Sequence, residues 1–290
     1  MLENFKSHLL NELPFLFSSK MIIATSSGVD SVVLCSLCKK LDLDFSIAHC
    51  DFSLRGKESD VDAKFTEDFA KSLNVLFYLK KFNTKKYKTK NHLSVQMAAR
   101  ELRYKWFDEL LANYDYVLTA HHLDDQLETF LINLSRGSGL EGLMGIPAIN
   151  DKKIRPLLSF SKDQILNYAT TNKIKWREDS SNLSDDYLRN EIRNKVISNF
   201  KKSSPTLLSN FNNSLQYLKA SRSILSEKIN EVSKSILVEE DYQIKYRIEE
   251  ILKLKNSEFY LHEFFYKYGF SHVNDIKNIL TSQSGKYVSS

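Results

Sequence analysis

The chain has 290 residues, of which 27% are charged, and a formal net charge of +5. This length suits one large domain followed by a smaller one. No apolar run approaches the roughly 20 residues of a membrane helix and no signal-like N-terminus is seen, so we expect a cytoplasmic protein without membrane association. The three cysteines argue against a disulfide framework, and the positive charge favours a polyanionic partner.

Residues 1–20 predict a lead-in helix with Phe5, Leu9 and Leu13 on its apolar side. Residues 21–24 are apolar or small and predict a short buried strand, residues 25–28 predict a tight polar turn, and apolar residues then recur at helical spacing from 30 to 41. The order is therefore strand, turn, helix.

That order directs a helix N-terminus and free backbone N–H groups at one point, which suits a phosphate. Gly28 tolerates positive φ, and the serines add hydroxyl donors. Asp30 would repel a bare phosphate, so it is expected to orient a metal ion or the loop. The other interpretation is an ordinary strand-turn-helix with a serine N-cap. The candidate nucleotide-binding residues are Ser26, Ser27, Gly28, Val29, Asp30 and Ser31.

Two further strands are predicted at 45–49 and 75–79. Between them, Ser59 is expected to cap a helix whose buried side carries Val61, Phe65, Phe69 and Leu73. This βαβαβ pattern implies a parallel sheet with right-handed crossovers, hence an α/β doubly wound fold. Cys35 and Cys38 form a CxxC inside the first helix of this unit, where we expect both to be buried as small apolar residues.

Residues 80–90 contain six lysines and no acidic residue, together with Phe82 and Tyr87. Such a segment is either a solvated loop or a track for a phosphate backbone, with the aromatic rings offering stacking faces to unpaired bases. Residues 94–112 predict a strong helix, on which Arg100 and Arg103 could face one phosphate.

A fourth strand at 116–119 leads into the polar sequence HHLDDQLET at 121–129. Open parallel sheets bind ligands beyond the carboxyl ends of their strands, so this sequence and the Ser26–Ser31 loop should meet at one edge. On a helix starting near residue 124, Asp125 and Glu128 share a face and form a doubly acidic pocket for an ammonium group or a metal ion. Alternatively, these acidic residues only stabilise a helix N-terminus.

Four of the eight glycines fall in RGSGLEGLMGIP at 136–147, which predicts a loop. Behind it come RPLL at 155–158, a helix predicted at 161–171, WREDSSN at 176–182 and YLRNEIR at 187–193, which contains Arg189 and Arg193.

The segment 26–31 resembles the SGGxDS pyrophosphate loop of the ATP pyrophosphatase superfamily, with Ser27 in place of its first Gly. Taken with AHHLDDQLETFLINLSRGSGLEGLMGIP, RPLL, WREDSSN and YLRNEIR in this order, residues 21–200 resemble the tRNA(Ile)-lysidine synthase family. The resemblance implies a parallel-sheet PP-loop ATP pyrophosphatase domain at 1–203, followed by a mainly helical tRNA-binding domain at 204–290.

The implied reaction uses ATP to adenylate C2 of the wobble cytidine in tRNA(Ile) with anticodon CAU, releasing pyrophosphate, after which free L-lysine displaces AMP to give lysidine. By resemblance, Asp30 would hold Mg²⁺, Asp125 and Glu128 would hold the lysine, and Arg189 would belong to the same pocket. The four catalytic candidates are thus Asp30, Asp125, Glu128 and Arg189. A PP-loop tRNA thiolase and a non-catalytic nucleotide- and tRNA-binding module remain alternatives, and a homodimer is left open.

Overall fold

The computed structural model describes residues 1–177, 187–240, 243–270, 272–282, 285 and 287. The chain divides into two compact units, Met1–Leu215 and Gln216–Ser290. Residues 178–182 of the WREDSSN motif lie outside the described residues. Among the helices that the structure describes, none combines the length and the apolar composition that crossing a bilayer requires.

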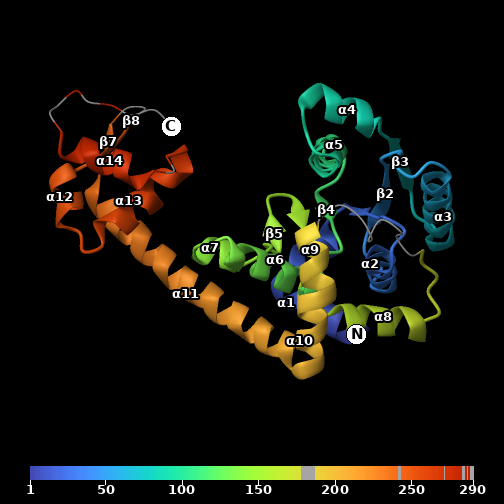
Figure 1. Cartoon of the computed structure of the whole chain (residues 1–290). Coiled ribbons are helices and arrows are strands. Elements are labelled where there is room, and N and C mark those ends of the chain that lie inside the picture. The colour runs from blue at the N-terminus through green and yellow to red at the C-terminus, as the bar shows by residue number, and fades with distance from the viewer. Residues whose placement is uncertain (178–186, 241–242, 271, 283–284, 286, 288–290) are drawn as a thin grey trace. The chain divides into compact units, whose positions relative to one another are not determined.

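Unit 1 is built on a six-stranded sheet with the strand order β3-β2-β1-β4-β6-β5 (Figure 1). All neighbouring pairs are parallel except β5 with β6. Met21 at the start of β1 aligns with Phe45 of β2 on one side and with Tyr116 of β4 on the other. The strands are β1 Met21–Ala24, β2 Phe45–Asp51, β3 Phe77–Lys81, β4 Tyr116–Leu118, β5 Ile149–Asn150 and β6 Lys153–Ile154. The predicted α/β fold with a mostly parallel sheet is confirmed.

Helical segments connect these strands and follow the sheet. They are α1 Leu2–Glu12, η1 Pro14–Ser18, α2 Val29–Lys40, α3 Lys57–Leu73, α4 Thr84–Asn91, α5 Val95–Leu110, α6 Leu123–Ser135, α7 Leu140–Leu143, α8 Lys162–Thr171, α9 Tyr187–Glu191, the π-helical η3 Ile192–Ile197 and α10 Ser198–Ser203.

The sheet is covered on both faces, because alternate strand residues enter different cores. Met21 and Ile23 of β1 belong to a core that also contains Phe5 and Leu9 of α1, Leu34 of α2 and Ile165 of α8. Ile22, between them, enters a second core with Trp106 and Phe107 of α5. The strand β1 is therefore buried on both sides, as its uninterrupted apolar sequence predicts.

The chain crosses from β3 to β4, which lies on the far side of β1, so the strand order reverses between β1 and β4. Ligands of open α/β sheets bind at such a reversal, outside the carboxyl ends of the strands. The Ser26–Ser31 loop follows β1, and α6 follows β4. The two predicted polar sequences therefore flank the same point, as expected.

Several local predictions were wrong. Pro14 divides the predicted lead-in helix into α1 and η1, since a proline inside a helix removes a hydrogen bond. The lysine-rich segment is the end of β3 followed by α4, whose N-cap Asn83 accepts a hydrogen bond from the N–H of Lys86 at 3.0 Å. The glycine-rich loop contains one helical turn, α7.

The predicted buried face of α3 was right in part: Phe69 and Leu73 pack against the core, but Val61 does not. Val61 is 48% exposed, whereas Ser59, Asp62 and Thr66 are buried. Helix α3 begins at Lys57 after Gly56, so Ser59 lies inside the helix and is not its N-cap. The buried residues of α3 also include Ala63 and Ala70, and the buried Asp62 makes ion pairs with Arg55 and Arg177.

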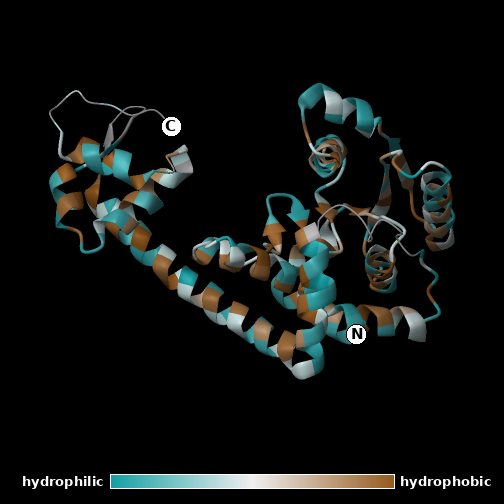
Figure 2. Cartoon of the chain, viewed as in Figure 1, coloured by the Kyte–Doolittle hydropathy of each residue, from teal (hydrophilic) through white to brown (hydrophobic). Residues whose placement is uncertain are grey.

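Unit 2 begins at Gln216, within the 30-residue helix α11, Leu207–Ile236. The hairpin β7 Leu237–Glu240 and β8 Gln243–Tyr246 follows, and then α12 Ile248–Lys253, α13 Ser257–Phe265, η4 Tyr266–Tyr268 and α14 Val273–Leu280. Hydrophobic and hydrophilic residues alternate along α11 (Figure 2). Its Ile229 and Ile236 pack in a core with residues of α12, α13 and α14.

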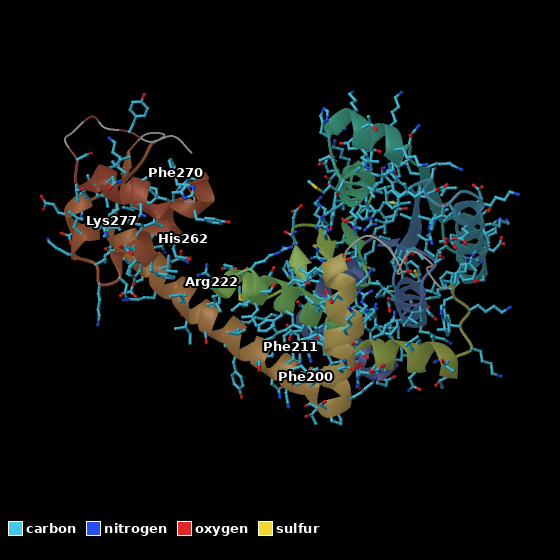
Figure 3. All side chains as sticks on the ribbon, in the orientation of Figure 1. Phe200, Phe211, Arg222, His262, Phe270 and Lys277 are labelled. Carbon is cyan, nitrogen blue, oxygen red and sulfur yellow. The ribbon has the colours of Figure 1, made fainter. Side chains whose placement is uncertain are left out.

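The division between the units runs through α11. Phe211 belongs to unit 1, where its ring lies 5.3 Å from that of Phe130 on α6, between centroids. Arg222, further along the helix, pairs with Glu263 of unit 2 at 3.0 Å. Figure 3 shows both side chains on α11. The domain boundary at residue 204 inferred from the sequence stays a prediction.

Candidate active site

The turn after β1 has an uncommon backbone conformation. Ser27, which stands where the pyrophosphate-loop pattern has a glycine, has a φ of 69° and is buried. The next residue, Gly28, has a φ of −71° and is the N-cap of α2. Residues with a Cβ seldom adopt the left-handed region, which explains why a glycine suits position 27.

Hydroxyl groups close the loop on itself. The Ser31 hydroxyl accepts a hydrogen bond from the N–H of Ser26 at 3.2 Å and donates one to the carbonyl of Gly28 at 3.0 Å. The Ser27 hydroxyl donates to the Ser26 carbonyl. In the described part of the chain, the N–H groups of Ser27 and Gly28 have no acceptor, and the first N–H groups of α2 have none within the helix. These donors form an anion-binding turn.

Asp30, in the first turn of α2, is paired with a lysine from a distant part of the chain. Lys162 Nζ lies 2.6 and 2.8 Å from the two carboxylate oxygens of Asp30. Lys162 is the first residue of α8, which Ser161 and Gln164 start with a reciprocal capping box. The Lys162 N–H also donates to Asp124 at 2.7 Å, so the N-termini of α2, α6 and α8 converge.

Helix α6 presents the two acidic residues that the sequence analysis selected. Asp125 accepts a hydrogen bond from the N–H of His122 at 3.0 Å, so it does stabilise the N-terminus of the helix. One turn later, the side chain of Glu128 is only 1% exposed. Both carboxylates also face α9 and η3, which supply their partners.

Two arginines neutralise this acidic pair. Arg189 Nε lies 2.8 Å from Glu128, and Arg193 contacts the same carboxylate at 2.5 and 3.0 Å. Each arginine also approaches Asp125, at 3.5 and 3.4 Å respectively. The site therefore contains a buried carboxylate pair with two guanidinium groups, rather than a purely acidic pocket.

The titration of these groups follows from their surroundings. Burial raises the pKa of Asp125, but His122, His121 and Arg189 together with the His122 N–H outweigh it, so the pKa lies below its ordinary value. Burial lowers the pKa of His121 to about 4, against the opposing effect of Asp125. Burial lowers the pKa of Arg193, but Glu128 more than compensates and raises it overall. Asp125 is therefore ionised and His121 neutral near pH 7.

The loop after β1 and helix α6 line one cavity of about 1080 Å³. Ser26, Gly28, Val29 and Asp30 from the loop side share it with Asp125 and Glu128 from α6. Ser27 and Ser31 are buried in the loop, and Arg189 reaches the site through Glu128. The structure thus brings together the residues selected from the sequence.

Other cavity residues were missed, or not selected, in the sequence analysis. They include His122, Asp124, Lys162, Arg177, Arg193 and Lys201. The sequence could have indicated Arg193, because it lies four residues after Arg189 in YLRNEIR and so shares a helix face with it. No local pattern indicates Lys162 or Lys201, since they reach the site only through the packing of α8 and α10. Lys201 pairs there with Asp124.

The lysine-rich segment offers fewer stacking faces than expected. Phe82 is 7% exposed and stacks on Phe52, so it cannot receive a base. Tyr87 donates a hydrogen bond to Glu101 at 2.9 Å and lies beneath Lys105. The guanidinium group of Arg103 lies 5.3 Å from the Phe52 ring centroid, and that of Arg100 lies 4.8 Å from the Tyr104 centroid. The segment is therefore a basic surface without free aromatic rings at these two positions.

The three cysteines are poorly suited to thiol chemistry. Cys35 and Cys38 are fully buried, as predicted. Burial raises the pKa of Cys35 to about 12 and that of Cys38 well above its usual range. Burial also raises the pKa of Cys50 to about 12. Reactive cysteines have lowered pKa values and are present as thiolates, whereas the pKa of each of these three thiols is raised.

Comparison with known proteins identifies the family. A profile of the PP-loop domain matches residues 1–200. The chain belongs to the PP-loop family. Membership in this family implies the use of ATP. A second profile, of the TilS substrate binding domain, matches residues 239–290.

Two relatives of this PP-loop protein align along nearly its whole length. The tRNA(Ile)-lysidine synthase of Parabacteroides distasonis is 37% identical over 270 residues, which is 92% of this chain and 61% of the relative. That of Bacteroides thetaiotaomicron is 34% identical over 285 residues, which is 97% of this chain and 65% of the relative. The chain thus spans less than two thirds of either relative. These matches confirm the resemblance to the tRNA(Ile)-lysidine synthase family.

Solved structures support the same fold. The U34-tRNA thiolase NcsA from Methanococcus maripaludis superposes with a TM-score of 0.61 at 17% identity, covering 75% of this chain and 79% of that one. At this identity the likeness concerns the PP-loop fold alone.

Proposed function

We propose that this chain carries the catalytic part of a tRNA(Ile)-lysidine synthase. It would use ATP to join free L-lysine to C2 of the wobble cytidine of tRNA(Ile) with anticodon CAU, through an adenylated tRNA intermediate and with release of AMP and pyrophosphate. The observation that carries the proposal is the single cavity shared by the PP loop, residues 26–31, and the pair Asp125 and Glu128.

The loop side of the cavity suits the nucleotide. The N–H groups at Ser27 and Gly28 and the N-terminus of α2 are donors for the pyrophosphate that leaves ATP. Lys162 lies at the same end of the cavity and adds a positive charge. Donors fixed before the reaction stabilise the charge that develops on the phosphates without having to reorganise.

Asp30 is the residue that would hold Mg²⁺ beside the phosphates. Among the described residues, no group of three or more His, Cys, Asp or Glu side chains forms a metal site. Mg²⁺ is commonly held by one or two carboxylates with substrate phosphates and waters, so a protein cage is not needed. Asp30 would hold the ion on release from Lys162, and the bound ion would neutralise phosphate charge.

The α6 side suits a zwitterionic amino acid. Arg189 and Arg193 can pair with the α-carboxylate of lysine, while Asp125 and Glu128 attract its ammonium groups. The nucleophile must be the neutral ε-amine, so one carboxylate has to accept a proton. Asp125 or Glu128 is the acceptor nearest to the bound ammonium group.

The tRNA is expected to contact both parts of the chain. The match of residues 239–290 to a substrate binding domain supports the role of residues 204–290 in tRNA binding. The basic segment 80–90 supports a second contact in unit 1, and the net charge of +5 favours a polyanion. We place the reaction in the cytoplasm, where tRNA and ATP meet; a homodimer remains open.

A tRNA thiolase is less well supported, because burial raises the pKa of all three cysteines and two of them are fully buried. A non-catalytic binding module would not require Asp30, Asp125 and Glu128 in one cavity.

One incubation separates these functions. The protein is mixed with ATP, labelled lysine and bulk tRNA, and tRNA-bound label, AMP and pyrophosphate are measured. A lysidine synthase incorporates lysine with equal amounts of AMP and pyrophosphate. A binding module produces none of the three, and a thiolase produces AMP without incorporating lysine when a sulfur donor is added.

A further inference from the structure

The PP loop contains a conformation that its own sequence does not favour. Ser27 has a φ of 69°, in the left-handed region that residues with a Cβ seldom adopt, and it is only 3% exposed. Such positions persist only where surrounding contacts hold them.

Groups from two other segments contact backbone carbonyl oxygens at Thr25, just before the loop, and at Ser27 within it. His49 Nδ1, at the end of β2, lies 2.8 Å from the carbonyl oxygen of Thr25. The backbone N–H of Arg177, after α8, donates to the carbonyl of Ser27 at 3.0 Å. The second contact fixes the peptide unit that follows the strained residue, and it depends on the position of Arg177.

The side chain of Arg177 pairs with Asp62. Arg177 Nε is 2.5 Å from Asp62 Oδ1, and Arg55 NH2 is 3.1 Å from Asp62 Oδ2. The Asp62 side chain is 6% exposed, whereas that of Arg177 is 35% exposed and lines the cavity. Asp62 itself does not line the cavity. A buried carboxylate on the polar face of α3 is thus linked, through one arginine, to the backbone of the PP loop.

We propose that Asp62 is a positioning residue for the PP loop: it anchors Arg177, whose N–H holds Ser27 in the left-handed conformation that presents the loop to ATP. This deepens the proposed function, because it rests on ATP binding at that loop. The contact matters in this chain because position 27 is serine; with a glycine there, the same φ is accessible without strain and the anchor is less needed.

The experiment is a double-mutant cycle between Asp62→Asn and Ser27→Gly in the full chain. The readout is the Kd for labelled ATP in equilibrium dialysis without tRNA. Because backbone strain of this kind is worth about one decade in affinity, Asp62→Asn should raise the Kd roughly tenfold with Ser27 present. Combined with Ser27→Gly, the same change should raise it less than about twofold.

Two further variants serve as a control and as a substitute for Asp62→Asn. Asp60→Asn removes an exposed carboxylate two residues earlier on α3, which pairs with Lys81, and should leave the Kd unchanged. Arg177→Gln breaks the same link from its more exposed end and is the substitute if Asp62→Asn does not fold. Its effect should also shrink in the Ser27→Gly background if Arg177 acts through the loop.

An equal rise in Kd in both backgrounds, or no rise at all, would overturn the positioning role while leaving ATP binding intact. If the unsubstituted protein binds no ATP, the proposed function itself fails, together with the role given to Asp62. The two failures are therefore distinguishable from the first measurement of the series.

Discussion

Lys162 and Asp30 are 132 residues apart in the sequence, yet Lys162 Nζ lies 2.6 and 2.8 Å from the two oxygens of the Asp30 carboxylate. The pair joins the N-termini of α2 and α8 across the nucleotide end of the cavity. Without a nucleotide, Lys162 keeps the acidic side chain neutralised; with ATP and Mg²⁺ bound, we expect Lys162 to turn to the phosphates.

Lys162→Gln tests this pairing. Removing the charge should raise the KM for ATP about tenfold or more, since a charge-assisted contact to phosphate is lost, while lysine affinity changes little. Lys175→Gln, an exposed lysine in the same part of the chain, is the matched control. Steady-state kinetics with varied ATP provide the measurement, and an unchanged KM would show that Lys162 does not contact the phosphates.

Glu128→Gln separates the two halves of the reaction. Lysine transfer should require much more lysine, whereas tRNA-dependent pyrophosphate release should persist, because ATP and cytidine do not need that carboxylate. The loss of one buried charge beside Arg189 and Arg193 should also reduce the free energy of unfolding by roughly 1–3 kcal/mol. Glu191→Gln, on the same helical segment as Arg189, serves as the control. Equal loss of both partial reactions would assign Glu128 to the nucleotide instead.

His121 should make stability depend on pH. Its pKa is about 4 in the folded chain and near 6.5 in the unfolded one, so the unfolded state binds more protons between these values. Stability should therefore fall as the pH falls from 6.5 to 4, by roughly 3 kcal/mol for this group. Urea unfolding at several pH values should show a smaller fall in His121→Asn than in the control His92→Asn, where the histidine is exposed. Identical pH profiles would contradict the assignment.

The position of the domain boundary can be tested by truncation. Phe211 and Leu215 are 7% and 2% exposed and belong to unit 1, although they follow residue 204. A chain of residues 1–220 should unfold at a higher urea concentration than one of residues 1–203, since burial of each side chain contributes roughly 1.5–3 kcal/mol. Equal midpoints would favour a boundary at residue 204.

The sequence predicts an element well where the spacing of apolar residues within that element is enough to define it. Unbroken apolar strands, and helices predicted at 30–41, 94–112 and 161–171, correspond to elements that the structure contains. Helical spacing is right only in part on α3, where Phe69 and Leu73 pack against the core but Val61 is exposed and Asp62 is buried. The buried Asp62 was missed because its partner Arg177 lies 115 residues away.

In the candidate site, too, local spacing predicts some residues, whereas others depend on contacts between distant segments. Asp125 and Glu128 could be paired from their spacing, since residues three apart share a helix face. That two arginines neutralise them, and that Lys162 neutralises Asp30, depends on tertiary packing that no local pattern encodes.

The most direct test of the central claim is the mass of the wobble nucleoside in tRNA(Ile) with anticodon CAU, after incubation with ATP, Mg²⁺ and lysine. The account predicts a cytidine that has gained one lysine with loss of water, and no such product with Asp30→Ala, which should still fold because the residue lies in the first turn after the loop. An unmodified cytidine with the unsubstituted protein, or a sulfur-containing nucleoside when a sulfur donor is added, would contradict it.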